Sequence, residues 1–104
     1  MSAFAVAINA IFADRNVALD ARWFAGGAGD GVPVRVVRRA PDQLAEFNGA
    51  RIVADSVLLD VRVSEVAALA RGDRIVIGDV AYEILGEPRR DAERLVWKGE
   101  ARAL

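Results

Sequence analysis

From residue 17 onward, this chain is a succession of short runs of β-branched and aromatic residues that alternate with turn signals. The clearest pair is residues 74–77 and 80–85, which flank Gly78-Asp79. A two-residue connection containing glycine, which tolerates positive φ, is typical of a β-hairpin. The same reasoning predicts seven short strands, at residues 17–23, 32–39, 51–54, 57–63, 74–77, 80–85 and 95–97. This pattern is typical of a small β-barrel or sandwich.

Two helices are expected beside the strands. Ser2 is a suitable N-cap for a helix within residues 1–14. The apolar side chains of this helix share one face of a 3.6-residue period: Phe4, Ile8, Ile11 and Phe12. Ser64 is a second N-cap, and Gly72 can close a short internal helix after it. The predicted fold class is therefore mainly β: a small barrel or sandwich of about seven short strands, with an N-terminal helix and one short internal helix.

The segments between these elements are expected to be irregular. Residues 26–31 are rich in glycine and are predicted to form a flexible hairpin tip. They do not fit a phosphate-binding loop, which needs a Gly-Lys-Ser/Thr ending and a following helix, whereas here a strand is expected to follow. Residues 41–50, PDQLAEFNGA, are the least regular part and are predicted to be a mobile loop. Residues 87–91 are predicted to be a loop and residues 99–104 a frayed tail. At 104 residues, the chain is expected to be one domain, residues 1–104.

The composition excludes several kinds of chemistry. The chain has no Cys and no His, so disulfides, thiolate metal sites and the usual general base near neutral pH are absent. The formal net charge is −1, without the basic excess of a nucleic-acid reader. The hydrophobic fraction of 54 % fits either a well-filled core or apolar surface that neighbouring subunits cover.

No segment is long enough to span a membrane. The longest apolar stretch, residues 3–13, is interrupted by Asn9 and falls short of the ~20 residues that a spanning helix needs. It also makes a poor signal peptide, because the first basic residue, Arg15, follows it. We therefore expect the protein to act inside a cell or within a particle assembled there.

Polar residues that could carry chemistry are better explained by local structure. No spacing among the aspartates Asp55, Asp60, Asp73 and Asp79 matches a known ligand loop. Ser2, Ser56 and Ser64 are the only aliphatic hydroxyls, and no His is present to activate them. We therefore predict no catalytic residues, no metal, no cofactor and no enzymatic activity.

Two arginine clusters remain open to two interpretations. One comprises Arg35, Arg38 and Arg39, and the other comprises Arg89, Arg90 and Arg94. Each is either a solvated face interleaved with acidic residues or a charged seam toward a partner ring or passing DNA. The N-terminal helix is similarly expected to pack either on its own barrel or on a neighbouring subunit.

The C-terminal third carries a pattern that resembles a known family. The residues are Val61-Arg62-Val63-Ser64-Glu65-Val66, Leu69-Ala70-Arg71-Gly72-Asp73, Ile75-Val76-Ile77-Gly78, Tyr82 and Leu95-Val96-Trp97. Their order resembles that of the tail attachment (head–tail joining) proteins of lambda-like long-tailed phages. The likeness runs from about Ala18 to Arg102.

This resemblance implies a structural virion protein and supplies no catalytic residues. It implies a ring, taken to be a hexamer, that closes the DNA-filled head and attaches the tail. The implied partners are portal or connector proteins and tail terminator or tail-tube proteins, and DNA passes through without sequence-specific binding. The implied location is the head–tail junction of the virion, with the host cytoplasm during assembly.

A joint that forms only on the assembling particle needs a contact that is unformed beforehand. Ordering a loop costs about 1–2 kcal/mol per residue, so residues 41–50 are expected to order only against a partner surface. The predicted partner interface is Arg38, Arg39, Asp42, Leu44, Glu46, Phe47 and Asn48.

Two alternatives remain. A small SH3-like or KOW-like barrel that binds RNA or a ribosomal partner has a similar Arg-Gly-Asp-Arg-Ile-Val-Ile-Gly segment. A stopper or tail terminator of another family would have a similar sequence pattern.

Overall fold

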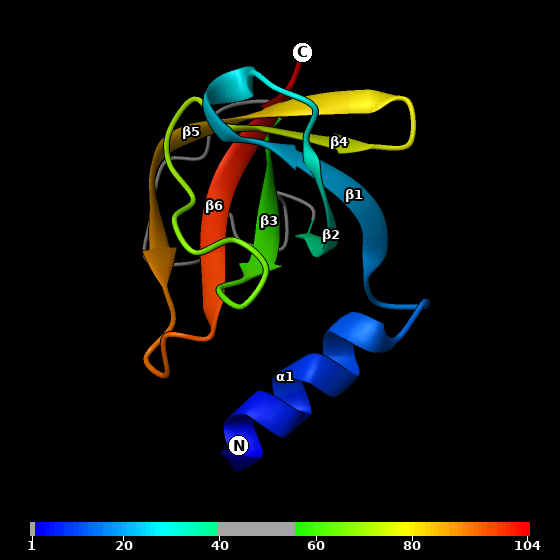
Figure 1. The fold of residues 1–104 in the computed structure, drawn as a ribbon, viewed down its shortest axis with the longest axis vertical. Coiled ribbons are helices and arrows are strands. Elements are labelled where there is room, and N and C mark those ends of the chain that lie inside the picture. The colour runs from blue at the N-terminus through cyan, green and yellow to red at the C-terminus, as the bar shows by residue number, and fades with distance from the viewer. Residues whose placement is uncertain (1, 40–55) are drawn as a thin grey trace.

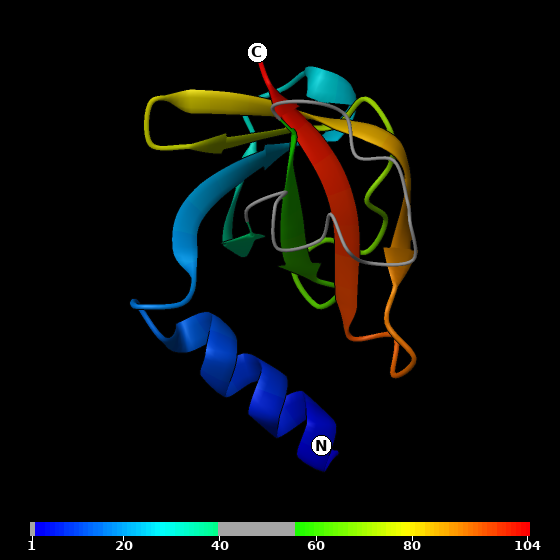
Figure 2. The same ribbon diagram turned by 180° about the vertical axis from the view of Figure 1, so that it is seen from behind.

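Every strand pairs antiparallel with a neighbour on each side, so the sheet closes into a barrel (Figures 1 and 2). The computed structural model describes residues 2–39 and 56–104. Within them the strand order around the barrel is β1-β2-β3-β6-β5-β4. The strands are β1 (Leu19–Phe24), β2 (Val32–Arg39), β3 (Ser56–Arg62), β4 (Arg74–Ile77), β5 (Val80–Arg90) and β6 (Val96–Ala103). The mainly β class and the barrel are confirmed, with six strands in the described residues; the strand expected at 51–54 lies outside them.

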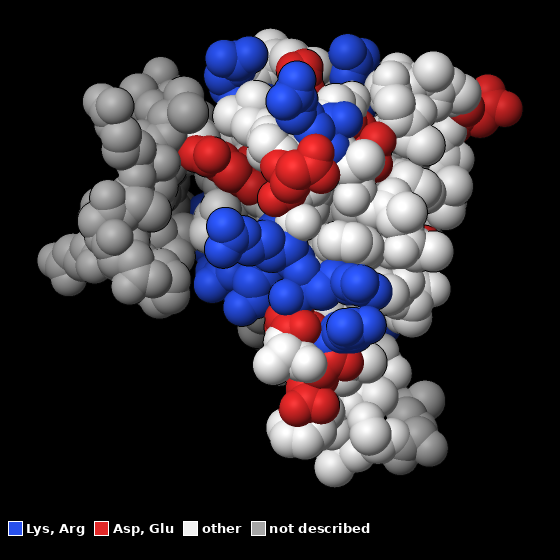
Figure 3. All heavy atoms as spheres, turned by 90° about the vertical axis from the view of Figure 1, so that its left-hand side faces the viewer, with Lys and Arg blue, Asp and Glu red and all other residues white. Residues whose placement is uncertain are grey.

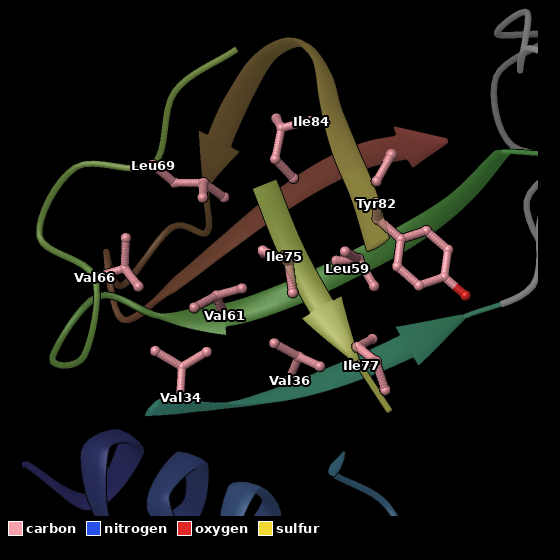
Figure 4. Close-up of a cluster of buried hydrophobic side chains, with 11 residues drawn as sticks. Val34, Val36, Leu59, Val61, Val66, Leu69, Ile75, Ile77, Tyr82 and Ile84 are labelled. Carbon is pink, nitrogen blue, oxygen red and sulfur yellow. The ribbon is translucent and has the colours of Figure 1, made fainter. Parts of the chain in front are cut away.

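Alternating side chains from all sides of the barrel fill its core (Figure 4). Val36 pairs with Val61 across β2 and β3, and Ile75 pairs with Tyr82 across β4 and β5. Because successive residues of a strand point to opposite faces, this register turns every second apolar side chain inward. The buried cluster is Val34, Val36, Leu59, Val61, Val66, Leu69, Ile75, Ile77, Tyr82, Ile84 and Ala101.

The predicted hairpin at Gly78-Asp79 is confirmed, and the connection between β1 and β2 is close to its prediction. Gly78 has a φ of +58°, and Ile77 pairs with Val80 across the turn. Between β1 and β2, residues 25–31 form a single 3-10 turn, η1 (Ala25–Gly27), and bends. Gly31 has a φ of +79°, and a Cβ there would lie 2.6 Å from Cγ of Arg22, so only glycine fits this position.

The last two strands are longer than predicted. β5 continues through Arg90, so the loop expected at 87–91 is wrong; the register with β6 shifts between Leu85 and Arg89, where Gly86 has a φ of +64°. Such a bulge accommodates Pro88 inside a strand. The frayed tail expected at 99–104 is also wrong, because β6 reaches Ala103 and Ala101 is fully buried. Small residues pack here: a Cβ on Gly99 would lie 3.4 Å from Cδ1 of Ile84.

The helix expected after Ser64 is absent, and this prediction is wrong. Residues 63–72 form turns that cross one end of the barrel. Val66 and Leu69 are both buried in the core, and Nε1 of Trp97 donates a 2.8 Å hydrogen bond to the carbonyl oxygen of Val66. A one- or two-turn helix is marginal by itself, and an open conformation delivers both side chains into the barrel.

The N-terminal helix α1 (Ala3–Ala13) is confirmed, together with its Ser2 cap. Oγ of Ser2 accepts a 3.0 Å hydrogen bond from the backbone N–H of Ala5. Within α1, however, Phe12 alone is buried, and it packs with Ala18 and Val96 in a second, smaller apolar cluster. In the described part of the chain, no helix has both the length and the apolar character needed to cross a membrane.

Candidate interaction surfaces

Two of the predicted interface residues, Arg38 and Arg39, lie at the end of β2. Nη1 of Arg38 donates a 3.1 Å hydrogen bond to Oη of Tyr82, a side chain of the barrel core. Nη2 of Arg39 lies 2.8 Å from Oδ1 of Asp60 on the neighbouring strand β3. The sequence alone did not indicate either of these contacts, which join residues 44 and 21 positions apart. The other predicted interface residues lie outside the described residues: Asp42, Leu44, Glu46, Phe47 and Asn48.

Asp60 lies in a row of charged residues that crosses the outside of the barrel. It pairs with Lys98 of β6, which in turn pairs with Arg89 of β5. Burial raises the pKa of the Asp60 carboxyl above its usual value of 3.8, although the hydrogen bond and charge of Arg39 and the charge of Lys98 act in the opposite direction. Desolvation therefore outweighs the ion pair at this position.

The second arginine cluster lies on the side of the barrel formed by β5 and β6. Arg90 lies over the ring of Trp97, with its guanidinium carbon 5.3 Å from the ring centroid. Arg89 faces Lys98 across the strands. Figure 3 shows a continuous band of Lys and Arg side chains on this side, with Asp and Glu side chains on both sides of the band. The band is thus a mixed-charge face with a basic centre.

Arg35, from the first cluster, has a structural role separate from that of Arg38 and Arg39. Its guanidinium donates hydrogen bonds to the carbonyl oxygens of Phe12 and Ala18, and it forms an ion pair with Asp20. These contacts join the end of α1 to β1 and β2. Alternation along β2 separates Arg35 from Arg38, which lies on the opposite face of the strand, whereas Arg39 shares the face of Arg35 but lies at the other end of β2, beside Asp60.

The Arg-Gly-Asp segment has a structural explanation in the buried carboxylate of Asp73. Oδ2 accepts hydrogen bonds from Nε1 of Trp23 at 2.9 Å and from the backbone N–H of Ala70 at 3.0 Å. Oδ1 accepts a 2.8 Å bond from the backbone N–H of Gly26. One carboxylate therefore joins β1, the 3-10 turn and the segment that closes the barrel. The sequence indicated a turn at this aspartate but not its contact with Trp23, 50 residues away.

A second set of polar contacts fixes α1 to the barrel. Nη1 of Arg62 donates a 3.0 Å hydrogen bond to Oδ1 of Asn9, and its guanidinium lies 5.3 Å from the centroid of the Phe12 ring. Oε1 of Glu65 accepts two hydrogen bonds from the Arg62 guanidinium and one from the backbone N–H of Arg35. These contacts involve the C-terminal half of the helix. The spacing of three residues between Arg62 and Glu65 fits their ion pair, whereas the contacts with Asn9, Phe12 and Arg35 were not predicted from the sequence.

The outer side of α1 is apolar and uncovered. Phe4 is 58 % exposed, Val6 56 % and Ile11 45 %, and no residue from Ala3 to Ala13 is charged. Between α1 and the barrel lies a cleft of about 150 Å³. Its lining is mostly apolar and comprises Ala5, Ile8, Asn9, Arg62, Ser64 and Leu95. This helix with its cleft is the main uncovered apolar surface of the described residues.

A model of the family described as Phage Head-Tail Attachment protein matches residues 1–101. The chain belongs to this family. Membership implies interaction with other phage head and tail proteins and a place in the virion, and it supports the head–tail interpretation over the RNA-binding barrel. Comparison with curated proteins and with solved structures found no similar protein.

Four polar side chains of this head–tail attachment protein that could have carried chemistry have structural partners. Oγ of the buried Ser56 donates a 3.0 Å hydrogen bond to Oε2 of Glu100, and Ser2 caps α1. Asp60 and Asp73 are held by Arg39 and by the Trp23 indole, respectively. Among residues 2–39 and 56–104, no three acidic side chains lie close enough together to hold a metal ion.

Proposed function

We propose that this protein forms a ring at the head–tail junction, closes the DNA-filled head and attaches the tail without catalysing a reaction. We take the ring to be a hexamer that contacts portal or connector proteins on one side and tail terminator or tail-tube proteins on the other. The observation that carries the proposal is the family match over residues 1–101. The protein is made in the host cytoplasm and ends in the virion.

The architecture supports association through side chains. In the part of the chain that the structure describes, every strand has a neighbour on both sides, so the barrel offers no complete strand edge by which copies could extend the sheet. Exposed apolar residues on α1 provide a surface for such contacts instead. The net charge of −1 fits a ring that lets DNA pass without binding a particular sequence.

Removal of the gene from its phage or prophage tests this function. We expect packed or leaking heads beside free, complete tails in electron micrographs, and restoration of joined particles when the gene is supplied from a plasmid. Normal yields of joined particles without the gene would refute the proposal.

We further propose that residues 38–48 contact a head or tail protein. The double variant Leu44→Asp with Phe47→Asp is expected to remain folded and soluble but to fail in joining heads to tails. The matched control is Val17→Asp with Val80→Asp, which adds the same two charges at exposed valines outside residues 38–48 and should leave joining unchanged. Normal particle yield from the double variant would refute this role.

A further inference from the structure

The surface of α1 contains both an exposed aromatic side chain and a cleft of matching size. Phe4 is the most exposed aromatic side chain of the helix, and the cleft beside the helix has a volume of about 150 Å³. Apolar cavities of this size in other proteins hold a benzene molecule. A phenyl ring therefore fits the cleft in both volume and polarity.

Phe4 does not line the cleft of its own chain. The residues of α1 that line the cleft are Ala5, Ile8 and Asn9, which share the side of the helix that faces the barrel. Phe4 borders this side, since Ile8 lies four residues further on, but Phe4 is exposed, as are Ala7 and Ile11. The helix is also fixed, since Arg62 and Arg35 hold its C-terminal half to the barrel. Among residues 2–39 and 56–104, no aromatic side chain lines the cleft, and another molecule can supply one.

We propose that Phe4 of one copy inserts into the cleft between α1 and the barrel of the next copy. The inference rests on the proposed assembly of this chain into a ring. Phe4 is not among the residues that line the cleft, so its insertion joins different residues of two identical copies, and such a contact can run head to tail, as a ring requires. α1 carries no charged side chain, so burying this face desolvates no ion of the helix. The helix also projects from one end of the barrel, where a neighbour can reach it (Figures 1 and 2).

Single-cysteine variants test the contact directly, because the natural chain contains no Cys. Phe4→Cys places a thiol on the inserted residue, and Ser64→Cys places one on the exposed rim of the cleft. When the two variants are mixed and oxidised, we expect several times more disulfide-linked dimer than either variant gives alone. Asp30→Cys, at an exposed turn, replaces Ser64→Cys in the control mixture and should give no such excess.

Two further variants test the same contact by sedimentation. Phe4→Asp is expected to abolish self-association without unfolding α1, because an acidic residue in the first turn suits the helix dipole. Ala5→Leu fills the cleft with a good helix former and should have the same effect. Val17→Asp, at an exposed valine outside the helix, should leave association unchanged.

The outcomes separate this inference from the proposed function. The inference is overturned if neither concentrated protein nor assembled particles give the mixed disulfide, or if Phe4→Cys alone cross-links as efficiently as the mixture. It is also overturned if Val17→Asp abolishes association as completely as Phe4→Asp. If the mixed disulfide forms but heads and tails join without the gene, the inference stands and the proposed function fails.

Discussion

The barrel and α1 differ in how completely their own chain covers them. In the barrel, strands pair on both sides and buried carboxylates have partners; even the indole N–H groups of Trp23 and Trp97 are satisfied. In α1, the Phe12 side chain is buried while Phe4, Val6 and Ile11 remain exposed. An uncharged helix with apolar residues around its circumference is normally covered. The barrel thus provides the stability of the fold, and α1 is the surface proposed to contact another molecule.

The largest expected effect of a single substitution comes from Asp73. Asp73→Ala removes the acceptor of three part-buried donors: Nε1 of Trp23 and the backbone N–H groups of Gly26 and Ala70. We expect the free energy of unfolding to fall by roughly 3 kcal/mol, measured by urea denaturation. Asp30→Ala, at an exposed turn, is the matched control and should change stability by less than about 0.5 kcal/mol. Equal losses in the two variants would show that the carboxylate does not organise the barrel.

A smaller effect is expected where the two regions meet. Arg62→Met keeps an unbranched side chain but removes the hydrogen bonds to Asn9 and Glu65 and the contact with the Phe12 ring. We expect amide hydrogen exchange in α1 to accelerate while exchange in the barrel strands stays slow, with a global loss of about 1 kcal/mol. Arg71→Met, at an exposed site, is the control. Uniform acceleration in helix and barrel would mean that the two regions unfold as one unit.

The same division explains what the sequence predicted. The hairpin of β4 and β5 was predicted correctly at its turn, because glycine at Gly78 and the alternation of the flanking strands agree. The end of β6 was not predicted, because it contains the small residues Gly99, Ala101 and Ala103. These lack the β-branched and aromatic side chains that are typical of strands. Ser64 and Gly72 are suitable capping residues, so the sequence favours a helix between them. The conformation of this segment is instead decided by Val66 and Leu69 entering the barrel.

The interaction surfaces were less predictable than the strands. Arg38 and Arg39 were identified from composition, but the contacts with Tyr82 and Asp60 depend on the register of strands far apart in the chain. The exposed face of α1 was hard to predict for a different reason. Its apolar period is visible in the sequence, yet periodicity does not reveal whether the chain covers that face itself.

The smallest expected effect concerns the pH dependence of the barrel through Asp60. Burial raises the pKa of this carboxyl above 3.8 in the folded state, so below pH 3.8 both folded and unfolded states hold the proton. As the pH rises, the unfolded state releases this proton first. The contribution of Asp60 to the free energy of unfolding therefore decreases with pH, and the decrease ends once the pH has passed the folded-state pKa. Each pKa unit corresponds to about 1.4 kcal/mol.

Asp60→Asn removes this titration and leaves the other carboxylates in place. We therefore expect the stability of the natural protein, relative to Asp60→Asn, to decrease from acid to neutral pH in paired denaturation series. An increase instead would mean that the 2.8 Å pair with Arg39 outweighs burial and holds the pKa down. Ion pairs would then stabilise the barrel in addition to apolar burial. This would be a second difference between the barrel and the uncharged helix α1.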